Sequence, residues 1–442
     1  MKRYPKYKDS GVEWLGEIPA HWEVKRNKII FKEKKNVVGE KATEFTLLSL
    51  TLRGVIARDI ENPKGKFPAE FNTYKIVEPN NLIFCLFDID ETPRTVGHSR
   101  QKGMITGAYT IVQCVANFDS YYFYYYYLSL DLNKQLKLLY TGLRKVITRD
   151  TFFTIKSPVP PPKEQKAIAH FLDDKIQQIE QFIRNKQRLI ELLNEQKTAI
   201  INRAVTKGIN PNAPMKHSGI EWLGEIPAHW EVRRLRYIGS CQNGISKGAD
   251  YFGFGYPFVN YTDVYANFEL PKMVIGLANS TDIDRIMYSV KEGDIFFTRT
   301  SETIEEIGIT STCLSSLENA TFSGFLIRVR PFANLILPGF SKYYFRCQLH
   351  RFFFVKEMNL VTRASLSQDL LKKLPVLLPP LSEQKAIASF IEEKLAKIDQ
   401  AIAQIEKEIE LIQEYRTTLI SDAVTGKIDV RPNSLIETTL TA

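Results

Sequence analysis

PVPPPKEQKAIAHFLDDKI, residues 158–176, decides the fold, because it returns later in the chain as PVLLPPLSEQKAIASFIEEKL, residues 375–395. The two copies align on EQKAIA with a shift of 219 residues. Prolines precede each motif, and neither proline nor glycine follows until Gly208 and Gly426. Prolines end the preceding element, and a long stretch free of both residues favours a helix. The sequence therefore predicts two long helices of matched length.

Both helices carry apolar residues at alternating spacings of four and three. The predicted seams comprise Leu172, Ile176, Ile179, Ile183, Ile190 and Leu193 in the first helix, and Ile391, Leu395, Ile398, Ile402, Ile405, Ile409 and Ile412 in the second. Lys186, Lys197 and Arg416 occupy three further seam positions. A period of 3.5 residues over four heptads is typical of a coiled coil. A lone amphipathic helix packed on its own domain is the alternative.

The direction of the two helices follows from their connection. The block that follows the first helix begins only about 30 residues after that helix ends, a short connection, so the second helix is expected to run back antiparallel. At about 1.5 Å per residue, Leu172 to Ile200 spans roughly 42 Å. One turn of B-DNA is about 34–36 Å. Two blocks on such a spacer could therefore reach two short sites separated by a fixed gap.

A second repeat precedes each block. SGVEWLGEIPAHWEV, residues 10–24, returns as SGIEWLGEIPAHWEV, residues 218–232, with 14 of 15 positions identical. All four tryptophans lie in these copies, and we expect them to anchor packing rather than to stack on bases. His21 and His229 have no metal-ligand neighbours. The chain is therefore two copies of one unit, about residues 10–209 and 218–428, related by an approximate two-fold axis.

The basic charge is concentrated in the two blocks between these repeats. Residues 26–155 have 19 basic and 13 acidic side chains, and residues 233–374 have 17 and 13, whereas the whole chain has a net charge of +9. Basic blocks suggest nucleic acid, and an ordinary solvated surface is the alternative. The blocks share predicted strands at residues 77–90 and 290–302, and again at 105–112 and 322–329. The aromatic run at residues 120–140 is interpreted as a core helix rather than a base-stacking surface.

Composition and missing motifs exclude several classes of protein. The chain has 442 residues and 44% apolar content, with no apolar run long enough for a membrane helix and no apolar core at its start. Its five cysteines form no CxxC pair, which indicates reduced thiols in a cytosolic protein. It contains no GxxxxGK[ST], HExxH, GxGxxG or [ND]PP[YF] motif. No metal site and no catalytic group are predicted.

These motifs resemble the specificity subunits of type I restriction–modification systems over almost the whole chain. The resemblance rests on PPPKEQKAIA (160–169), PPLSEQKAIA (379–388), the two tryptophan segments, and the order segment, block, helix written twice. It implies an α+β fold in which two α/β target recognition domains are separated by two long antiparallel coiled-coil helices. The implied domains are residues 1–25, the first repeated segment; 26–157, recognition domain one; 158–209, the central spacer helix; 210–232, a linker with the second segment; 233–375, recognition domain two; 376–428, the C-terminal spacer helix; and 429–442, a tail.

The resemblance also implies a function. Each recognition domain would read one half of a split DNA sequence, while the helices dock two modification (methyltransferase) subunits, joined by two restriction (motor-nuclease) subunits. The chain itself would be non-catalytic and bind no cofactor, with S-adenosylmethionine, ATP and magnesium held by its partners. A self-contained restriction or modification enzyme with a divergent active site is the alternative. A scaffold that bridges partners and ignores DNA is a third possibility.

Charge and analogy single out seven candidate DNA contacts. They are Arg94, Arg100 and Lys102 in one polar loop, Lys247 and Arg299 in the second block, and Arg144 and Arg363 at matching places in the two blocks. Arg144 and Arg363 are expected to touch phosphate, while the others are expected to reach base edges in the major groove. For each residue, an ordinary surface or structural charge is the alternative.

Overall fold

A computed structural model describes residues 2–59, 70–140, 145–301, 306–333, 335–357 and 364–432. The chain forms two compact units. The first unit combines residues 1–186 with 406–442, and the second contains residues 187–405. Each unit therefore holds one block together with part of each long helix.

The first unit contains twelve named strands and several helices within its described residues. In chain order they are β1 (Tyr7–Asp9), β2 (Glu17–Pro19), β3 (Glu23–Arg26), α1 (Asn27–Ile30), β4 (Phe31–Lys34), β5 (Leu48–Thr51), β6 (Gly54–Ala57), β7 (Lys75–Val77), β8 (Asn81–Phe84), β9 (Val96–His98), β10 (Gly103–Ile105), β11 (Thr110–Cys114), α2 (Ser120–Leu132), α3 (Arg149–Thr154), β12 (Lys156–Val159) and α4 (Pro162–Lys207), which continues into the second unit. Short 3-10 turns cover Gly39–Glu44 and Gln135–Leu139.

The second unit repeats this organisation. Its elements are β13 (Met215–His217), β14 (Glu225–Pro227), β15 (Glu231–Arg234), β16 (Gly239–Asn243), β17 (Phe252–Val259), α5 (Tyr261–Ala266), β18 (Leu277–Ala278), α6 (Asp282–Met287), β19 (Ile295–Thr298), β20 (Thr300–Ser301), β21 (Thr310–Thr312), β22 (Thr321–Phe322), β23 (Leu326–Pro331), α7 (Pro338–Tyr344), α8 (Leu349–Glu357), β24 (Ala364–Ser365), α9 (Gln368–Lys373), β25 (Pro375–Leu378) and α10 (Leu381–Val424), which continues into the first unit. Short 3-10 turns cover Leu235–Tyr237 and Ala249–Tyr251.

The same antiparallel four-stranded sheet forms the centre of each block. Its order is β4-β11-β8-β9 in the first unit and β16-β23-β19-β21 in the second. The strands predicted from the paired segments are β8 with β19 and β11 with β23, so these predictions are confirmed. The hairpins β1-β2 and β13-β14 and the pairs β3-β12 and β15-β25 also correspond. The internal repeat is therefore a repeat of fold.

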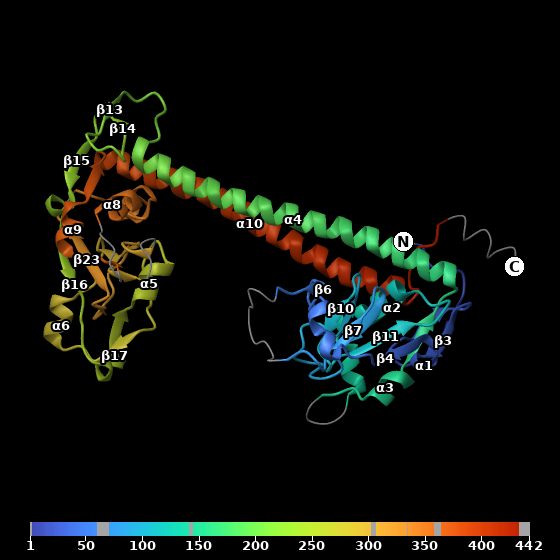
Figure 1. The fold of residues 1–442 in the computed structure, drawn as a ribbon. Coiled ribbons are helices and arrows are strands. Elements are labelled where there is room, and N and C mark those ends of the chain that lie inside the picture. Colours follow the sequence, from blue (N-terminus) through green and yellow to red (C-terminus); the bar gives the residue numbers. More distant parts are fainter. Residues whose placement is uncertain are drawn as a thin grey trace. The chain divides into compact units, whose positions relative to one another are not determined.

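The aromatic run forms α2, a helix that packs as core. Tyr122, Phe123, Tyr126 and Tyr127 are fully buried, and the Asp119 carboxylate caps the helix by accepting from the Tyr122 backbone N–H at 2.9 Å. In the first unit α2 lies against the end of α10 (Figure 1), where the Tyr122 hydroxyl donates to the Val424 carbonyl at 3.0 Å. The prediction of core rather than base stacking is confirmed for these side chains.

The long helices pair antiparallel within the first unit. Leu172 and Ile179 of α4 share one core cluster with Leu419 and Ile420 of α10. Farther along α4, Lys186 forms an ion pair with Glu408 at 2.6 Å. Residue numbers therefore rise along one helix while those of its partner fall.

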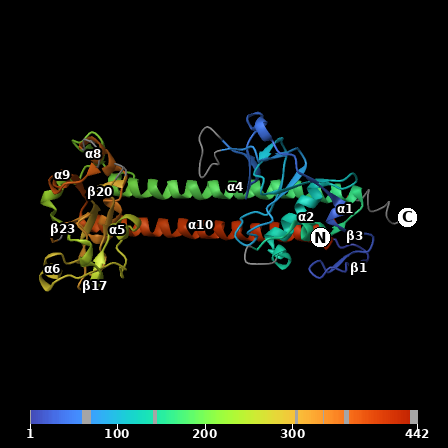
Figure 2. The same ribbon diagram turned by 60° about the horizontal axis from the view of Figure 1, so that its bottom comes forward.

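The second unit shows the same pairing with the roles exchanged. The end of α4 and the start of α10 share a core cluster, and Lys197 donates to Asp399 at 2.5 Å. The helices run side by side along each unit in both views (Figures 1 and 2). All thirteen predicted seam residues are buried or half-buried. Antiparallel pairing is thus confirmed, and the 42 Å spacing of the two blocks stays a prediction.

In the first unit, the repeated tryptophan segment joins the start of one long helix to the end of the other. Glu164, in the first turn of α4, accepts from Trp22 Nε1 at 3.0 Å and from the Tyr4 hydroxyl, and lies 2.9 Å from His21 Nε2. Gly426, just after α10, has φ of +74°, and a Cβ there would lie 2.4 Å from Pro19. Glycine suits this position because it tolerates the left-handed region and the close approach.

The second copy builds the same joint in the second unit. Glu383, in the first turn of α10, accepts from Trp230 Nε1 at 3.0 Å and lies 2.7 Å from His229 Nε2. Gly208, after α4, again has φ of +74° and approaches Trp230. Trp22 and Trp230 are both fully buried, so the tryptophans of these joints anchor packing as predicted. The histidines pair with carboxylates.

The glutamine of each EQKAIA motif holds the residue at the start of an earlier helix, α2 in the first unit and α7 in the second. Gln165 accepts from the Asp119 backbone N–H at 2.8 Å, and Gln384 accepts from the Leu337 backbone N–H at 2.8 Å. Each side chain also donates to a proline carbonyl five residues earlier. The repeated motif therefore connects segment, block and helix in each unit.

All five cysteines are free. Within the described part of the chain, no helix is long and apolar enough to cross a membrane.

We expect the seam to dominate the stability contributed by α4. Leu172 is fully buried, whereas Leu189 on the same helix is 40% exposed. Leu172→Ala should lower the free energy of unfolding by about 2–5 kcal/mol because a cavity replaces packed methyl groups. Leu189→Ala is the matched control and should change it by under about 1 kcal/mol. Equal losses in denaturant unfolding would contradict the assigned seam.

The first joint gives a second expectation. Glu164→Ala leaves the buried Trp22 N–H and Tyr4 hydroxyl without their acceptor, which should cost about 1–3 kcal/mol for each donor. Glu191→Ala, which removes an exposed carboxylate paired with Arg188 on the same helix, serves as the control and should have little effect. Thermal unfolding of the two variants tests this, and unchanged stability of Glu164→Ala would show that the joint is unimportant.

Candidate nucleic-acid interface

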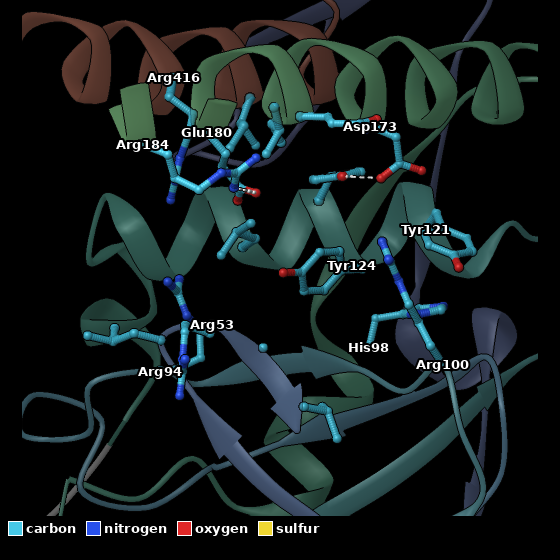
Figure 3. Close-up of a pocket in the computed structure, with 18 residues that line it drawn as sticks. Arg53, Arg94, His98, Arg100, Tyr121, Tyr124, Asp173, Glu180, Arg184 and Arg416 are labelled. Atoms are coloured by element: carbon cyan, nitrogen blue, oxygen red, sulfur yellow. Dashed lines mark hydrogen bonds and ion pairs between the residues drawn. The ribbon is translucent and has the colours of Figure 1, made fainter. Parts of the chain in front are cut away.

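Five arginines of the first unit surround one cavity of about 980 Å³. Arg53 comes from the β5-β6 turn, Arg94 and Arg100 flank β9, Arg184 comes from α4, and Arg416 comes from α10. Figure 3 shows Arg184 and Arg416 on the helix side of the cavity and Arg53 and Arg94 opposite them, with Tyr124 between. The antiparallel helix pair brings Arg184 and Arg416 to one place.

Arg94 is the most deeply buried of the predicted DNA contacts that the structure describes. Its side chain is 7% exposed, and Nη1 forms an ion pair with Asp131 at 3.1 Å. The same carboxylate oxygen accepts from the Thr95 backbone N–H at 3.3 Å. Its charge is thus balanced inside the first unit, so Arg94 positions the wall of the cavity, and its contact with a base stays a prediction.

Arg100 and Lys102, by contrast, are exposed. Arg100 lines the cavity and forms no ion pair within the described part of the chain. Lys102 lies 3.3 Å from Glu78 and above the Phe45 ring at 5.5 Å. The structure therefore places Arg94 and Arg100 at one cavity but does not place Lys102 there.

His98 lies at the same cavity in an uncharged state. Its ring packs against the Tyr121 ring with centroids 4.0 Å apart and planes tilted by 31°, and Nε2 lies 3.0 Å from the Ser120 hydroxyl. Burial, and secondarily the positive Arg100, lowers the pKa of His98 to about 4. At neutral pH the positive charge of the cavity therefore comes from the arginines.

The second unit brings Lys247 and Arg299 to one segment. Lys247 is exposed in the loop after β16, and the neighbouring Ile245 carbonyl accepts from the Gly324 N–H at 2.8 Å. Arg299, at the end of β19, donates through Nη1 to the Gly324 carbonyl at 3.4 Å. Phe325 beside them is 61% exposed. This segment is the counterpart candidate in the second unit.

Other basic side chains of the second block are structural. Arg330 contacts the buried Asp294 through two nitrogens at 2.6 Å each. Arg346 donates to the backbone carbonyls of Asn267 and Thr310. Burial lowers the pKa of Arg328 to about 10. These three arginines of the block therefore serve internal packing rather than a surface for DNA.

Two of the predicted contacts cannot be placed, and three cavity arginines were missed. Arg144 and Arg363 lie outside the described residues. Arg53, Arg184 and Arg416 were not predicted as contacts. Arg416 left a signal in the sequence, because it interrupts an otherwise apolar seam. No sequence pattern marked Arg184 and Arg53, because only the tertiary fold brings them to the same cavity.

Two copies of one sheet domain, each packed with its own part of the paired helices and each with basic side chains at a candidate site, define an internally repeated α+β protein. The family model for the type I restriction modification DNA specificity domain matches residues 99–192 and 227–411, more than half of the chain. The chain belongs to this family.

Named relatives agree with this assignment. The chain is 24% identical over 287 residues to the EcoKI specificity subunit of Escherichia coli K12, covering 63% of this chain and 59% of that protein. It is 28% identical to the MjaVIII specificity subunit of Methanocaldococcus jannaschii, covering 66% of each. It is 25% identical to the putative MjaX specificity subunit of the same organism, covering 94% of this chain and 96% of that one. The chain thus spans less than two thirds of the first two relatives and nearly all of the third.

Solved structures share the fold. A chain from a structural study of complex assembly in a type I restriction–modification system aligns with a TM-score of 0.67 at 12% identity, covering 93% of this chain and 99% of that one. The HsdS subunit of Thermoanaerobacter tengcongensis aligns with a TM-score of 0.54 at 13% identity, covering 93% and 98%. Two sheet domains with paired long helices are therefore the common architecture.

The uncharged His98 predicts a pH-dependent stability. An unfolded histidine titrates near 6.5, so between pH 6.5 and about 4 the unfolded state binds a proton that the folded state does not. The free energy of unfolding should therefore fall as pH falls, by up to about 3 kcal/mol. His98→Gln removes this contribution. The stability advantage of wild type over the variant should shrink from pH 7 to 4 and stay constant from pH 7 to 8 in denaturant unfolding; a constant difference at all pH values would contradict a neutral His98.

Proposed function

We propose that this chain reads a two-part DNA sequence for a type I restriction–modification complex. Each recognition domain binds one half-site, and the chain positions the enzymes that modify or cut the DNA. It has no catalytic role of its own, so its mechanism is placement. Phosphate contacts fix its register on the duplex, while a few side chains reach base edges in the major groove.

One observation carries this proposal: the same frame occurs twice with different basic side chains at the candidate sites. The two sheets have the same strand order. The first presents Arg100 at a cavity, whereas the second presents Lys247 and Arg299 beside Gly324. A common scaffold with unlike surfaces is what two half-sites of different sequence require.

The partners follow from the family. Two methyltransferase subunits would supply S-adenosylmethionine chemistry, and two motor-nuclease subunits would use ATP and magnesium, in the cytoplasm. The outer faces of the helices suit docking, because they expose apolar side chains away from the seam. These are Phe182, Leu411 and Tyr415 in the first unit and Leu189 and Leu192 in the second, each 39–51% exposed. Burial of such side chains is typical of protein interfaces.

No observation favours a self-contained enzyme. In the part of the chain that the structure describes, no group of three or more His, Cys, Asp or Glu residues could hold a metal ion. Purified chain incubated with S-adenosylmethionine and DNA tests the point directly. Methyl transfer or cleavage without partner subunits would overturn the proposed role.

Single substitutions should change one half-site at a time. Arg100→Ala should relax the sequence read by the first domain, and Arg299→Ala the sequence read by the second, at a cost of about 1–3 kcal/mol at one base pair if the side chain reads a base. Methylated adenines mapped across a genome that carries the system give both half-sites and their gap. Arg188→Ala, on an exposed helix face, is the control and should leave both half-sites intact. Loss of specificity in both halves from one substitution would contradict separate readers.

A further inference from the structure

The cavity of the first unit contains more positive charge than its own carboxylates neutralise. Arg94 is paired with Asp131, and Arg184 lies 3.9 Å from the Glu180 carboxylate and donates to the Gln181 side-chain oxygen at 2.9 Å. Asp173 already accepts from the Tyr125 hydroxyl at 2.5 Å. Arg53, Arg100 and Arg416 form no ion pair with any described residue and face the same space.

Unpaired guanidinium groups in a partly enclosed space repel one another. The effective dielectric is lower there than in bulk water, so the repulsion is less well screened. An anion that enters the space lowers this cost and gains charge-assisted hydrogen bonds. The unit as it stands is therefore electrostatically prepared for a negative ligand.

In the second unit, the cation at the corresponding helix position is paired with a carboxylate of the other helix. The repeat shift of 219 residues relates Glu180 to Asp399 and Arg416 to Lys197. In the second unit Lys197 donates to Asp399 at 2.5 Å, so this cation is neutralised within the helix pair. In the first unit Arg416 has no such partner among the described residues and lines the cavity instead. The two units therefore differ in whether the seam cation is paired across the helices.

The identity of the side chains favours phosphate. Arginine presents a planar fork of donors that matches phosphate oxygens, which lysine does not. Tyr121 and Tyr124 add hydroxyl groups to the lining. Figure 3 shows the arginines on opposite walls, Arg184 and Arg416 from the helices and Arg53 from the sheet domain. Walls arranged in this way suit a ligand with more than one phosphate group.

We propose that this cavity binds successive phosphates of the DNA backbone beside the first half-site, and that Arg184 and Arg416 on the long helices are direct phosphate contacts. The inference rests on the proposed function for the source of the phosphates. It gives the helices a second role, as part of the DNA-binding surface in the first unit.

The test uses the full chain in complex with its methyltransferase subunits. Duplex DNA carrying the mapped site is bound over a range of roughly 0.05 to 0.3 M salt for wild type and for Arg184→Gln/Arg416→Gln. Each lost phosphate contact reduces the slope of log K against log salt by about 0.9, so the double variant should show a slope lower by about 1.8. Its affinity should fall equally for sites of different sequence, because phosphates carry no base identity.

Two further variants make the result specific. Arg188 lies one turn after Arg184 on α4, is paired with Glu191 and does not line the cavity. The Arg188→Gln variant should therefore retain the wild-type slope. Arg53→Gln removes a cation from the opposite wall without altering either helix, and should lower the slope by about 0.9. This variant keeps the test decisive if the helix substitutions impair folding. Wild-type slopes in both cavity variants would overturn the proposal.

A titration with ATP distinguishes the source of the phosphate. One result would assign the cavity to a free nucleotide and overturn the DNA assignment. In that result, the wild type binds ATP at one site per chain, both cavity variants lose this binding, and both keep the wild-type salt slope for DNA. A wild-type complex without any sequence preference would refute the proposed function instead. The slope comparison would still report on phosphate binding in that case.

Discussion

A carboxylate at the start of each long helix, buried for Glu164 and half-buried for Glu383, is the contact around which each unit is arranged. Burying such a group is costly unless donors surround it. Glu164 meets this condition only because Trp22, Tyr4 and His21 approach it, and that approach in turn places Pro19 and Trp22 against Gly426 at the end of the other helix. One interaction thus fixes the repeated segment, the beginning of α4 and the end of α10 together in the first unit. Glu383 does the same in the second unit with the roles of the helices exchanged.

The joint restricts its own residues but leaves the basic side chains of the sheets free to vary. The joint combines an indole and an imidazole that contact one carboxylate with a left-handed glycine that lies against the tryptophan, so few substitutions preserve it. The copies of the tryptophan segment accordingly differ at one position in 15. The exposed cations of the two sheets take no part in the joint. Their identities can therefore change without disturbing the frame, and such freedom suits a protein whose two halves read different sequences.

The sequence was informative where structure depends on local periodicity or on comparison of the two copies. The helices, the seams, the antiparallel pairing and the central strands were all predictable in this way. The cavity was not, because Arg53, Arg184 and Arg416 come from three separate elements and meet only through tertiary packing. Charge counting also overestimated the surface of the second block: Arg330 is held by Asp294, and Arg346 by backbone carbonyls. The sequence alone does not show whether a basic side chain will be paired with a buried carboxylate or carbonyl of the folded protein.

Arg416 belongs both to the helix seam and to the cavity. An arginine in a coiled-coil seam is unfavourable unless its charge reaches water or a partner, and in the second unit the corresponding Lys197 finds Asp399. Arg416 instead opens toward the block that packs on it. In the proposed complex, that block and the helix pair would hold the same DNA backbone. The orientation of the block on its helices would then be fixed by DNA as well as by the joint, so that recognition and assembly depend on one surface.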